Sequence, residues 1–561
     1  MIQGSGLRSA YSATLGRIKA QNGSKARLGM EVLMWLSHSE EPLNTGELCD
    51  ALGVEIGSTD LNSENIPTIE TLLGCSLGLV TVGASSYTVR LVHYTLKEYL
   101  SDNTDLFNRP HSMIAEVCLT YLNFESVRNL PLAYNSTSLG GPFLHYASRY
   151  WGRHARMEIT ESISSLALGL LDRFDHHVSS GILLTRINDE WDYFYEGDWY
   201  HRYGEDLRYN DEDHIHDYCD CKFILWESTG FTGLHAIAYF GMVEIVVGLL
   251  AMGKWDLNET DMWGSTAILC AAREGHWAIV KILLTQEEAT PDTKDMMGRT
   301  PLSWAAEGGD EDVLKILLGR EDVTPDTADK DGRTPLSWAA GNGEKDVVKI
   351  LLGRDDVAHD TADKDGRTLL SWAAGNGWKD VVKILLERDD VTFNTADKDG
   401  RTPFLWAAKS GDEDAVKTLL GRDDITPDSE DIRGRTPLSW PAGNGHKEIA
   451  KILLEQEDVI PGTADKTGRT PLSWAVEHGH KRVVEMLLQR CSVSSDIVMT
   501  DLTSQPVRAR TSEKQHGGAQ KRRLENQGST HQSESSNIST DLFPGHSSEP
   551  SQRPSKRIRR S

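Results

Sequence analysis

The stretch DKDGRTPLSWAAGNGEKDVVKILL, residues 329–352, contains the signals that predict the fold of this chain. Thr334 is a favourable helix cap, and Pro335 suits the first helical position, where a missing N–H costs nothing. Gly343 is expected to end this first helix. A second helix follows, with an apolar face made by Val347, Ile350 and Leu351. The stretch therefore predicts two short helices that follow a turn at residues 329–332.

This unit is repeated along the C-terminal half of the chain. A G-R-T tripeptide recurs every 34 residues, and its glycines are Gly298, Gly332, Gly366, Gly400, Gly434 and Gly468. Two degenerate copies precede them on the same period, at Gly230 and Gly264. A unit of this size cannot bury its apolar face alone, so neighbouring units must stack. The sequence predicts a solenoid of eight units.

The contents of the unit indicate the kind of repeat. A 34-residue period also fits tetratricopeptide repeats, but T-P-L-S-W-A-A followed by V-V-K-I-L-L resembles the ankyrin pattern. Ankyrin units usually have 33 residues, and a loop can absorb the extra one. The resemblance implies a mainly α fold with an ankyrin-repeat solenoid at residues 230–490 and β-hairpin tips. It also implies a protein partner on the tips and on the exposed, concave face of the first helices.

The resemblance can be carried over to individual residues. Trp378 flanks the implied partner surface. The implied contact residues at the tips are Lys330, Asp331, Arg333, Lys364, Asp365, Arg367, Lys398, Asp399 and Arg401. These residues vary little between units, so the alternative is that they are solvated turn residues without a ligand. The first helices end in Gly-Asn pairs such as Gly341 and Asn342, which offer little contact area.

A tryptophan recurs in six units, at Trp304, Trp338, Trp372, Trp406, Trp440 and Trp474. An aromatic ladder that binds a ligand is one interpretation. We expect instead that these side chains fill the core between repeats, because every repeat needs core residues at a periodic position. Two units depart from the pattern: Leu369 replaces the turn proline, and Pro441 should remove a backbone hydrogen bond near the start of its helix.

The N-terminal part has a different pattern. Residues 26–36 form an amphipathic segment, and residues 76–92 alternate around Gly83 as in a hairpin, before helical spacing returns. This order predicts a winged-helix-like domain over residues 1–110. VLMWLSHSEEPLNTGELCDALGVE and VRLVHYTLKEYL resemble the winged-helix segment of fungal NACHT (NOD-like) proteins and of GPI inositol-deacylase-like proteins. Residues 111–187 predict a helical region. Within it, IAEVCLTYLNF (114–124) and PFLHYASRYWGRHAR (142–156) resemble the helical stretch between NACHT and ankyrin repeats in those fungal proteins.

That resemblance implies an NTPase domain upstream, with a phosphate-binding P-loop. The sequence contains no such motif, and about two dozen residues precede the winged-helix-like segment. We expect the chain to be the recognition half of a NOD-like protein without its NTPase, unless further coding sequence lies upstream. The alternative function is a nuclear regulator whose repeats dock transcription factors.

Composition limits the partners and the compartment. The net charge of −25 makes binding of nucleic acid or an anionic membrane by the folded body unfavourable. The seven cysteines are scattered, there is no apolar signal sequence, and no apolar run approaches the length of a membrane span. We therefore expect a cytoplasmic protein. The oligomeric state is left open.

The C-terminal tail, residues 491–561, predicts a disordered segment because it is rich in polar residues. It carries 11 Lys and Arg against 7 Asp and Glu. A basic cluster near its end resembles a nuclear-import signal, which makes the nucleus the alternative compartment. This cluster consists of Lys556, Arg557, Arg559 and Arg560.

Two groups of residues raise the question of chemistry. Residues 188–229 form an acidic, aromatic linker with a candidate zinc cluster at His214, His216, Cys219 and Cys221. Its spacing is unusual for zinc, so we expect a partner-ordered or solvated loop and no metal. His93 and Glu98 could pair in catalysis, but no nucleophile motif accompanies them, so we expect a core histidine. No enzymatic activity and no cofactor are expected.

Overall fold

In the computed structural model the described residues are 3–83, 86–132, 141–187, 228–253, 255–388 and 390–492. One continuous set of buried apolar side chains runs from Tyr11 to Leu487. The candidate zinc cluster and the basic cluster of the tail lie outside the described residues. None of the helices in the described part is long and apolar enough to cross a membrane.

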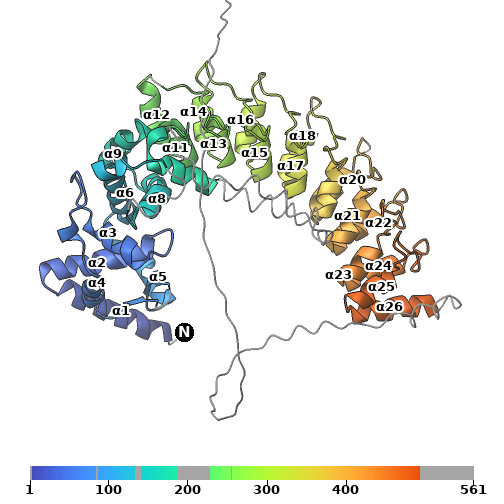
Figure 1. Ribbon diagram of the computed structural model, residues 1–561, viewed down its shortest axis with the longest axis horizontal. Helices are drawn as coiled ribbons and strands as arrows, with labels where there is room; N and C mark the ends of the chain where they lie inside the picture. Colours follow the sequence, from blue (N-terminus) through green and yellow to red (C-terminus); the bar gives the residue numbers. More distant parts are fainter. Residues whose placement is uncertain are drawn as a thin grey trace, which may run out of the picture. The chain divides into compact units, whose positions relative to one another are not determined.

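The N-terminal part contains helices followed by a small hairpin, as predicted for a winged helix (Figure 1). Strand β1 pairs antiparallel with β2, and Val80 lies opposite Leu91. Asn44 and Glu47 form a capping box that starts α3. The elements are α1 Gln3–Lys19, α2 Gly23–His38, α3 Thr45–Gly53, η1 Ser63–Asn65, α4 Ile69–Cys75, β1 Val80–Val82, β2 Val89–Leu91, α5 Tyr94–Asp102 and η2 Thr104–Leu106.

A helical region follows, as predicted, and it has an aromatic core. The ring of Trp35 on α2 contacts Phe143 and Tyr146, with ring centroids 5.7 and 5.9 Å away. The elements of this region are α6 Pro110–Leu122, α7 Glu125–Arg128, α8 Leu144–Met157, α9 Glu161–Leu171, η4 Phe174–His176 and a helix over residues 178–187.

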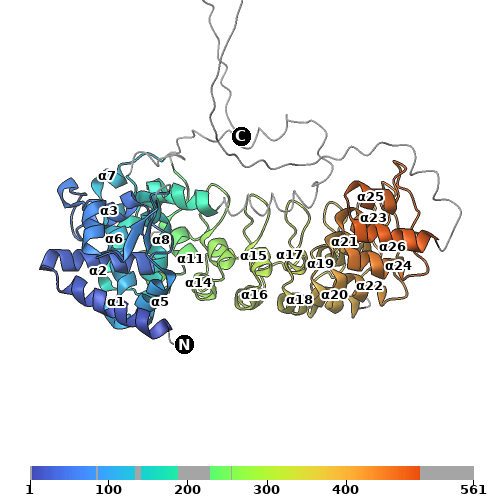
Figure 2. The same cartoon turned by 90° about the horizontal axis from the view of Figure 1, so that it is seen from below.

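This region packs directly on the first repeat. The rings of Trp151 on α8 and Phe240 are 5.0 Å apart between centroids. Phe240 also lies over Gly152, where a Cβ atom would be 2.2 Å from the ring. A glycine is therefore required for this close approach. Figure 2 shows α8 between the N-terminal helices and α11, residues Gly233–Phe240.

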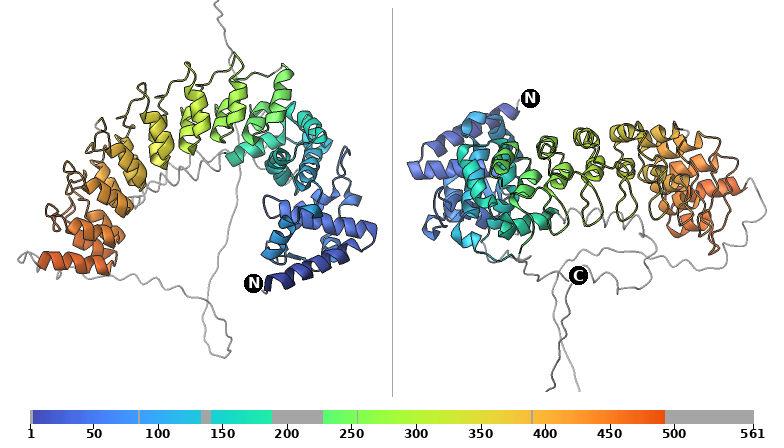
Figure 3. Two further views of the ribbon diagram at one scale, coloured as in Figure 1. Left: turned by 180° about the vertical axis from the view of Figure 1, so that it is seen from behind. Right: turned by 90° about the horizontal axis from the view of Figure 1, so that it is seen from above.

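The C-terminal part that the structure describes consists of eight helix pairs. The pairs follow one another in chain order in both views of Figure 3. They are α11 Gly233–Phe240 with α12 Val243–Ala251, α13 Ala267–Arg273 with α14 Trp277–Leu283, α15 Pro301–Gly308 with α16 Glu311–Leu318, α17 Pro335–Asn342 with α18 Lys345–Leu352, α19 Leu369–Gly375 with α20 Lys379–Leu386, α21 Pro403–Ser410 with α22 Glu413–Leu420, α23 Ser439–Asn444 with α24 Lys447–Leu454, and α25 Pro471–Glu477 with α26 Lys481–Ser492. The first helix of each pair is called the inner helix here, and the second is called the outer helix.

The local signals of the repeat are confirmed. The Thr334 hydroxyl accepts a hydrogen bond from the Ser337 N–H at 3.3 Å, and Gly343 ends α17 with a φ of +82°. The inner helix α19 still begins at Leu369, although the turn proline is missing. The expected effect of Pro441 is also present, because α23 begins only at Ser439.

Neighbouring repeats are joined along their tips and along their outer helices. The Lys364 N–H donates to Asp331 O at 2.8 Å, and the Lys398 N–H donates to Asp365 O at 2.7 Å. At the outer helices, the Arg388 guanidinium donates to Leu352 O of the preceding repeat at 3.1 Å. This bond satisfies a carbonyl at the C-terminus of the preceding outer helix. The tips thus form a continuous rim whose members are held to one another by backbone hydrogen bonds.

Candidate partner-binding face

The tip residues predicted to bind a partner fall into two groups. Lys330, Lys364 and Lys398 are exposed along the rim, as is Asp399, whereas Asp331 and Asp365 are half-buried. In contrast, the three tip arginines are almost completely buried. The exposed fractions are 5% for Arg333, 8% for Arg367 and 6% for Arg401.

The arginines are buried because each lies between two tryptophans. The Arg333 guanidinium is 4.6 Å from the ring centroid of Trp338 in its own repeat and 4.1 Å from that of Trp372 in the next. Arg367 lies in the same way between Trp372 and Trp406, at 4.8 and 4.7 Å. A cation above an aromatic face is attracted by the ring quadrupole, most strongly when both are desolvated. We call this alternation of arginine and tryptophan the Arg–Trp ladder.

The prediction for Arg333, Arg367 and Arg401 is therefore corrected. Their side chains lie between adjacent repeats, and at most 8% of each residue is exposed. The expectation that the tryptophans belong to the core is confirmed for the four that are buried, Trp304, Trp372, Trp406 and Trp440. Trp338 and Trp474 are half-buried. The core at this level contains charged as well as apolar groups.

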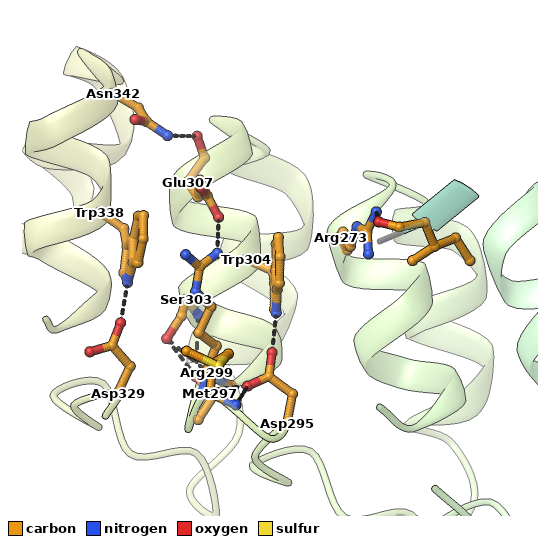
Figure 4. Close-up of polar contacts among 12 residues, drawn as sticks. Arg273, Asp295, Met297, Arg299, Ser303, Trp304, Glu307, Asp329, Trp338 and Asn342 are labelled. Atoms are coloured by element: carbon orange, nitrogen blue, oxygen red, sulfur yellow. Dashed lines mark hydrogen bonds and ion pairs between the residues drawn. The ribbon is translucent and has the colours of Figure 1, made fainter. Parts of the chain in front are cut away.

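A buried aspartate accepts a hydrogen bond from a tryptophan of the Arg–Trp ladder. Asp295 accepts the Trp304 indole N–H at 3.1 Å on Oδ2, and its Oδ1 accepts the backbone N–H groups of Met297 and Arg299, both at 2.8 Å (Figure 4). Burial raises the pKa of Asp295, and these hydrogen bonds together with Arg299 oppose the rise. The same indole-to-carboxylate bond joins Trp338 to Asp329 at 3.0 Å.

The sequence interpretation missed this role because it assigned the aspartate to the turn alone. The available signal was its spacing, since an aspartate precedes each ladder tryptophan by nine residues. These aspartates are Asp295, Asp329, Asp363, Asp397, Asp431 and Asp465.

One position at the end of the inner helix differs between repeats. It lies seven residues after the capping threonine and is occupied by Glu307, Gly341, Gly375, Lys409, Gly443 and Glu477 in successive repeats. Glu307 is largely buried, and its carboxylate accepts from the Arg299 guanidinium at 2.7 Å. Figure 4 shows this pair beside Trp304 and Trp338. Burial raises the pKa of Glu307, and Arg299 is the strongest of the groups that oppose the rise.

Where this position is glycine, it contributes no side chain against the tryptophan of the next repeat. A Cβ atom on Gly375 would be 3.4 Å from the Trp406 ring, in ordinary contact. A hollow of about 380 Å³ lies over Gly375, and we call it the Gly375 hollow. Its lining residues are Arg367, Ser371, Trp372, Gly375, Asn376, Trp406, Lys409, Ser410, Asn444 and His446.

The charge of this hollow is opposite to that of the whole chain. Among the described lining residues, Arg367 and Lys409 carry a positive charge. His446 is the other ionisable residue of the lining, and burial lowers its pKa. The Lys409 ammonium is 4.9 Å from the ring centroids of both Trp406 and Trp440. The hollow therefore combines cations and aromatic faces within a chain of net charge −25.

A second hollow, of about 540 Å³, lies at the N-terminal ends of the outer helices. Trp378 lines it and is 42% exposed, and its indole N–H donates to Gly341 O at 2.6 Å. The ring packs on Gly343, whose Cβ would be 2.5 Å from the indole. The charged lining residues are Glu311, Glu344, Lys345, Asp346, Lys379, Asp380, Asp412 and Asp414. The structure thus places Trp378 at an exposed, mainly acidic surface.

The candidates for other chemistry have structural roles or lie outside the described residues. His93 is exposed and caps α5, where its Nδ1 accepts the Thr95 N–H at 3.2 Å. The expectation of a core histidine was therefore wrong, because this side chain caps the helix start at the surface. Within the described residues there is no group of three or more His, Cys, Asp or Glu side chains that could hold a metal ion.

Comparison with known families agrees with the repeat architecture. A family model described as ankyrin repeats in three copies matches residues 213–295, 234–325, 287–360, 355–431 and 423–501, together just over half of the chain. A model described as the winged helix domain of GPI inositol-deacylase matches residues 17–130. No curated protein matches the chain.

Proposed function

This chain belongs to the ankyrin-repeat family, and we propose that it holds a protein partner on the rim of repeat tips and on the inner-helix ends beside it. Ankyrin repeats imply protein partners. The rim itself supports this location of the binding surface. Lys330, Lys364 and Lys398 project from tips that backbone hydrogen bonds hold together, so a partner would meet a prearranged row of cations.

The test removes the row of tip lysines and compares the effect on partner capture with the removal of a matched row of lysines elsewhere. The variant Lys330→Ala/Lys364→Ala/Lys398→Ala is used in the full chain to capture partners from a lysate of the source organism. The control is Lys349→Ala/Lys383→Ala/Lys417→Ala, which removes exposed lysines from the outer helices of the same repeats. We expect the tip variant to lose partners that the control retains. Equal retention by both variants would exclude the rim as the binding surface.

The finer assignment is that this chain acts as the recognition half of a NOD-like-receptor-type protein in the cytoplasm. The match to the GPI inositol-deacylase winged helix domain, followed by helices and ankyrin repeats, supports this assignment. We propose no catalytic activity for the chain itself. Mapping the 5′ end of the transcript provides a test. An in-frame P-loop upstream would make the protein an NTPase of this type, whereas stop codons upstream in every frame of the mature transcript would leave a recognition half without an NTPase.

The basic cluster at residues 556–560 favours a second candidate, a nuclear regulator with the same binding surface. A fluorescent fusion of the full chain is compared with one that lacks residues 553–560. Nuclear accumulation that depends on these residues supports the nuclear role. An unchanged cytoplasmic distribution rejects it.

A further inference from the structure

We propose that the rim binds a partner segment that carries apolar side chains followed by carboxylates. The apolar side chains lie on Met262 and Met296, and the carboxylates face the tip lysines. This inference rests on the proposed function and specifies the chemistry of the partner along that surface. It comes from a comparison of one position across the repeats, the position that Lys330 occupies in its own repeat. We call it the tip position.

The tip position changes from apolar to cationic along the rim. Met262 is 37% exposed and Met296 is 49% exposed. Lysine occupies the same turn in four other repeats, so the turn itself does not require an apolar residue. Exposed methionines gain burial only from a molecule outside the chain, and their flexible side chains suit such contacts. In chain order the tip position holds Met262, Met296, Lys330, Lys364, Lys398, Ile432 and Lys466.

The two methionines lie on adjacent tips that backbone hydrogen bonds join. The Met296 N–H donates to Trp263 O at 2.8 Å, and the Lys330 N–H donates to Met297 O, also at 2.8 Å. Trp263 and Met297 follow the two methionines in sequence and are half-buried. The lysine tips carry aspartates at the position of Trp263 and Met297. The apolar end of the rim therefore continues directly into the row of lysines.

This apolar pair is distinct from single exposed apolar residues elsewhere on the rim. Ile432 is 51% exposed at the tip position, but its neighbours there are Lys398 and Lys466. Among the tips that the structure describes, Met262 and Met296 are the one pair of apolar neighbours. Single exposed apolar residues are normal on a protein surface, whereas adjacent ones indicate an interaction site.

The three tips after the methionines offer ammonium groups to the partner. Lys330, Lys364 and Lys398 are exposed. Of the aspartates that follow them, two are half-buried, and the carboxylate of the exposed Asp399 is 3.1 Å from the Arg401 guanidinium. Carboxylates are therefore the partner side chains that complement this part of the rim.

The spacing of the tips matches a partner segment in the polyproline II conformation. The axes of packed helices are about 8–10 Å apart, and we expect tips that are joined by backbone hydrogen bonds to follow this spacing. In polyproline II every third side chain lies on the same face, about 9 Å further along the segment. One partner side chain can therefore meet each tip in turn.

The test uses the full chain and short peptides with this spacing. The probe is fluorescein-Leu-Pro-Ser-Leu-Pro-Ser-Glu-Pro-Ser-Glu-Pro-Ser-Glu-amide. It is also made in the reverse order, and the tighter of the two is used. One control peptide has Ser in place of Leu, and the other has Gln in place of Glu.

Fluorescence anisotropy measures the affinities at low salt. We expect the probe to bind saturably, the Ser control to bind about tenfold more weakly, and the Gln control severalfold more weakly. Absence of saturable binding, or equal binding of the probe and either control, would overturn the proposal.

Methyl NMR of the full chain, with methionine ¹³C-labelled at its methyl group, locates the bound probe. The signals of Met262 and Met296 are assigned with Met→Leu variants. We expect both signals to shift on binding. The signals of Met157 and Met252, which are exposed on α8 and at the end of α12, should not shift. Shifts confined to other methionines would place the probe elsewhere and reject the proposal.

The matched variant removes the apolar pair without adding charge. Met262→Gln/Met296→Gln keeps the side-chain length, and lysine at the same position in four repeats indicates that the turn accepts a polar residue. We expect this variant to bind the probe as weakly as the unmodified chain binds the Ser control. The control variant Met157→Gln/Met252→Gln should retain full affinity. An unchanged affinity of the rim variant would contradict the proposal.

The outcomes also separate this inference from other occupants and from the proposed function. Self-association in sedimentation experiments that Met262→Gln/Met296→Gln abolishes would assign the methionines to a second copy of the chain and reject the proposal. If the tip-lysine variant loses partners that Met262→Gln/Met296→Gln retains, the proposed function stands and this inference fails. If the tip-lysine variant retains all partners, the proposed function fails whatever the peptides do.

Discussion

The guanidinium of Arg299 lies 3.7 Å from the ring centroid of Trp338, across the boundary between two repeats. The same relationship joins Arg333 to Trp372 and Arg367 to Trp406. These contacts link the end of one tip to the inner helix of the next repeat. Because stability in a repeat protein is a sum of unit terms and interface terms, such contacts should couple neighbouring units.

The first prediction concerns this coupling. Replacing Arg333 by Met keeps most of the side-chain volume but removes the cation between Trp338 and Trp372. We expect a loss of about 1–2 kcal/mol in local stability, which is the range for desolvated cation–π contacts. Hydrogen exchange of peptides from α17 and α19 measures it. Lys330→Met, at an exposed site of the same tip, is the control and should change protection little.

The second prediction concerns the aspartate anchor. Asp295→Ala leaves two backbone N–H groups and the Trp304 indole N–H without their acceptor, so we expect a loss of about 2–4 kcal/mol. Asp295→Asn keeps one oxygen and should cost less. Chemical denaturation followed by hydrogen exchange in α15 distinguishes the variants. Equal stabilities of the Ala and Asn variants would show that the oxygen at this position does not matter.

The third prediction concerns the contact between the helical region and the repeats. A Cβ atom on Gly152 would be 2.2 Å from Phe240, so Gly152→Ala must displace α8 or the ring. We expect a loss of about 1–3 kcal/mol and faster proteolysis between α9 and α11. Gly248→Ala is the control, since its Cβ would meet nothing within 4 Å. That variant should be neutral or slightly stabilising, because alanine favours a helix.

The fourth prediction concerns acid sensitivity of the N-terminal part. His154 is fully buried, its Nδ1 is 2.8 Å from the Nδ1 of His111, and its Nε2 is 2.9 Å from the Tyr146 hydroxyl. The two Nδ1 atoms share one hydrogen bond, so one ring must supply the acceptor in its neutral form. Burial lowers the pKa of His154 to about 3, with His111 and His38 acting in the same direction. Glu158 and Glu40 raise the pKa of His111, although burial lowers it overall.

A folded pKa below the unfolded value of 6.5 means that the unfolded chain binds the proton more readily. The stability from His154 is therefore complete above pH 6.5 and is lost as the pH falls toward 3, by about 2 kcal/mol at pH 5. Hydrogen exchange in α6 and α8 at pH 7 and pH 5 tests this expectation. His154→Gln, which cannot take up the proton, should show a smaller difference between the two pH values. A difference as large as that of the unmodified chain would assign the effect to other groups.

The sequence alone determined the repeat and its phase. A capping threonine, a proline at the first helical position and a left-handed glycine act within a few residues, so Thr334, Pro335 and Gly343 could be assigned from their neighbours. The same reasoning predicted that Pro441 removes a backbone hydrogen bond near the start of its helix, and α23 begins only at Ser439. The exposed tip lysines also followed from local turn chemistry.

Only the tertiary structure decided the positions of the arginines and the shape of the binding face. The sequence pattern assigns Arg333 to a turn. Its partner Trp372 lies 39 positions away along the chain, and stacking of the repeats brings the two side chains together. The Gly375 hollow likewise exists because Trp406 and Lys409 of the next repeat surround the place where a side chain is missing. Contacts between units depend on how the helices stack. Local sequence propensity contains no information about which residues of neighbouring repeats this stacking brings together.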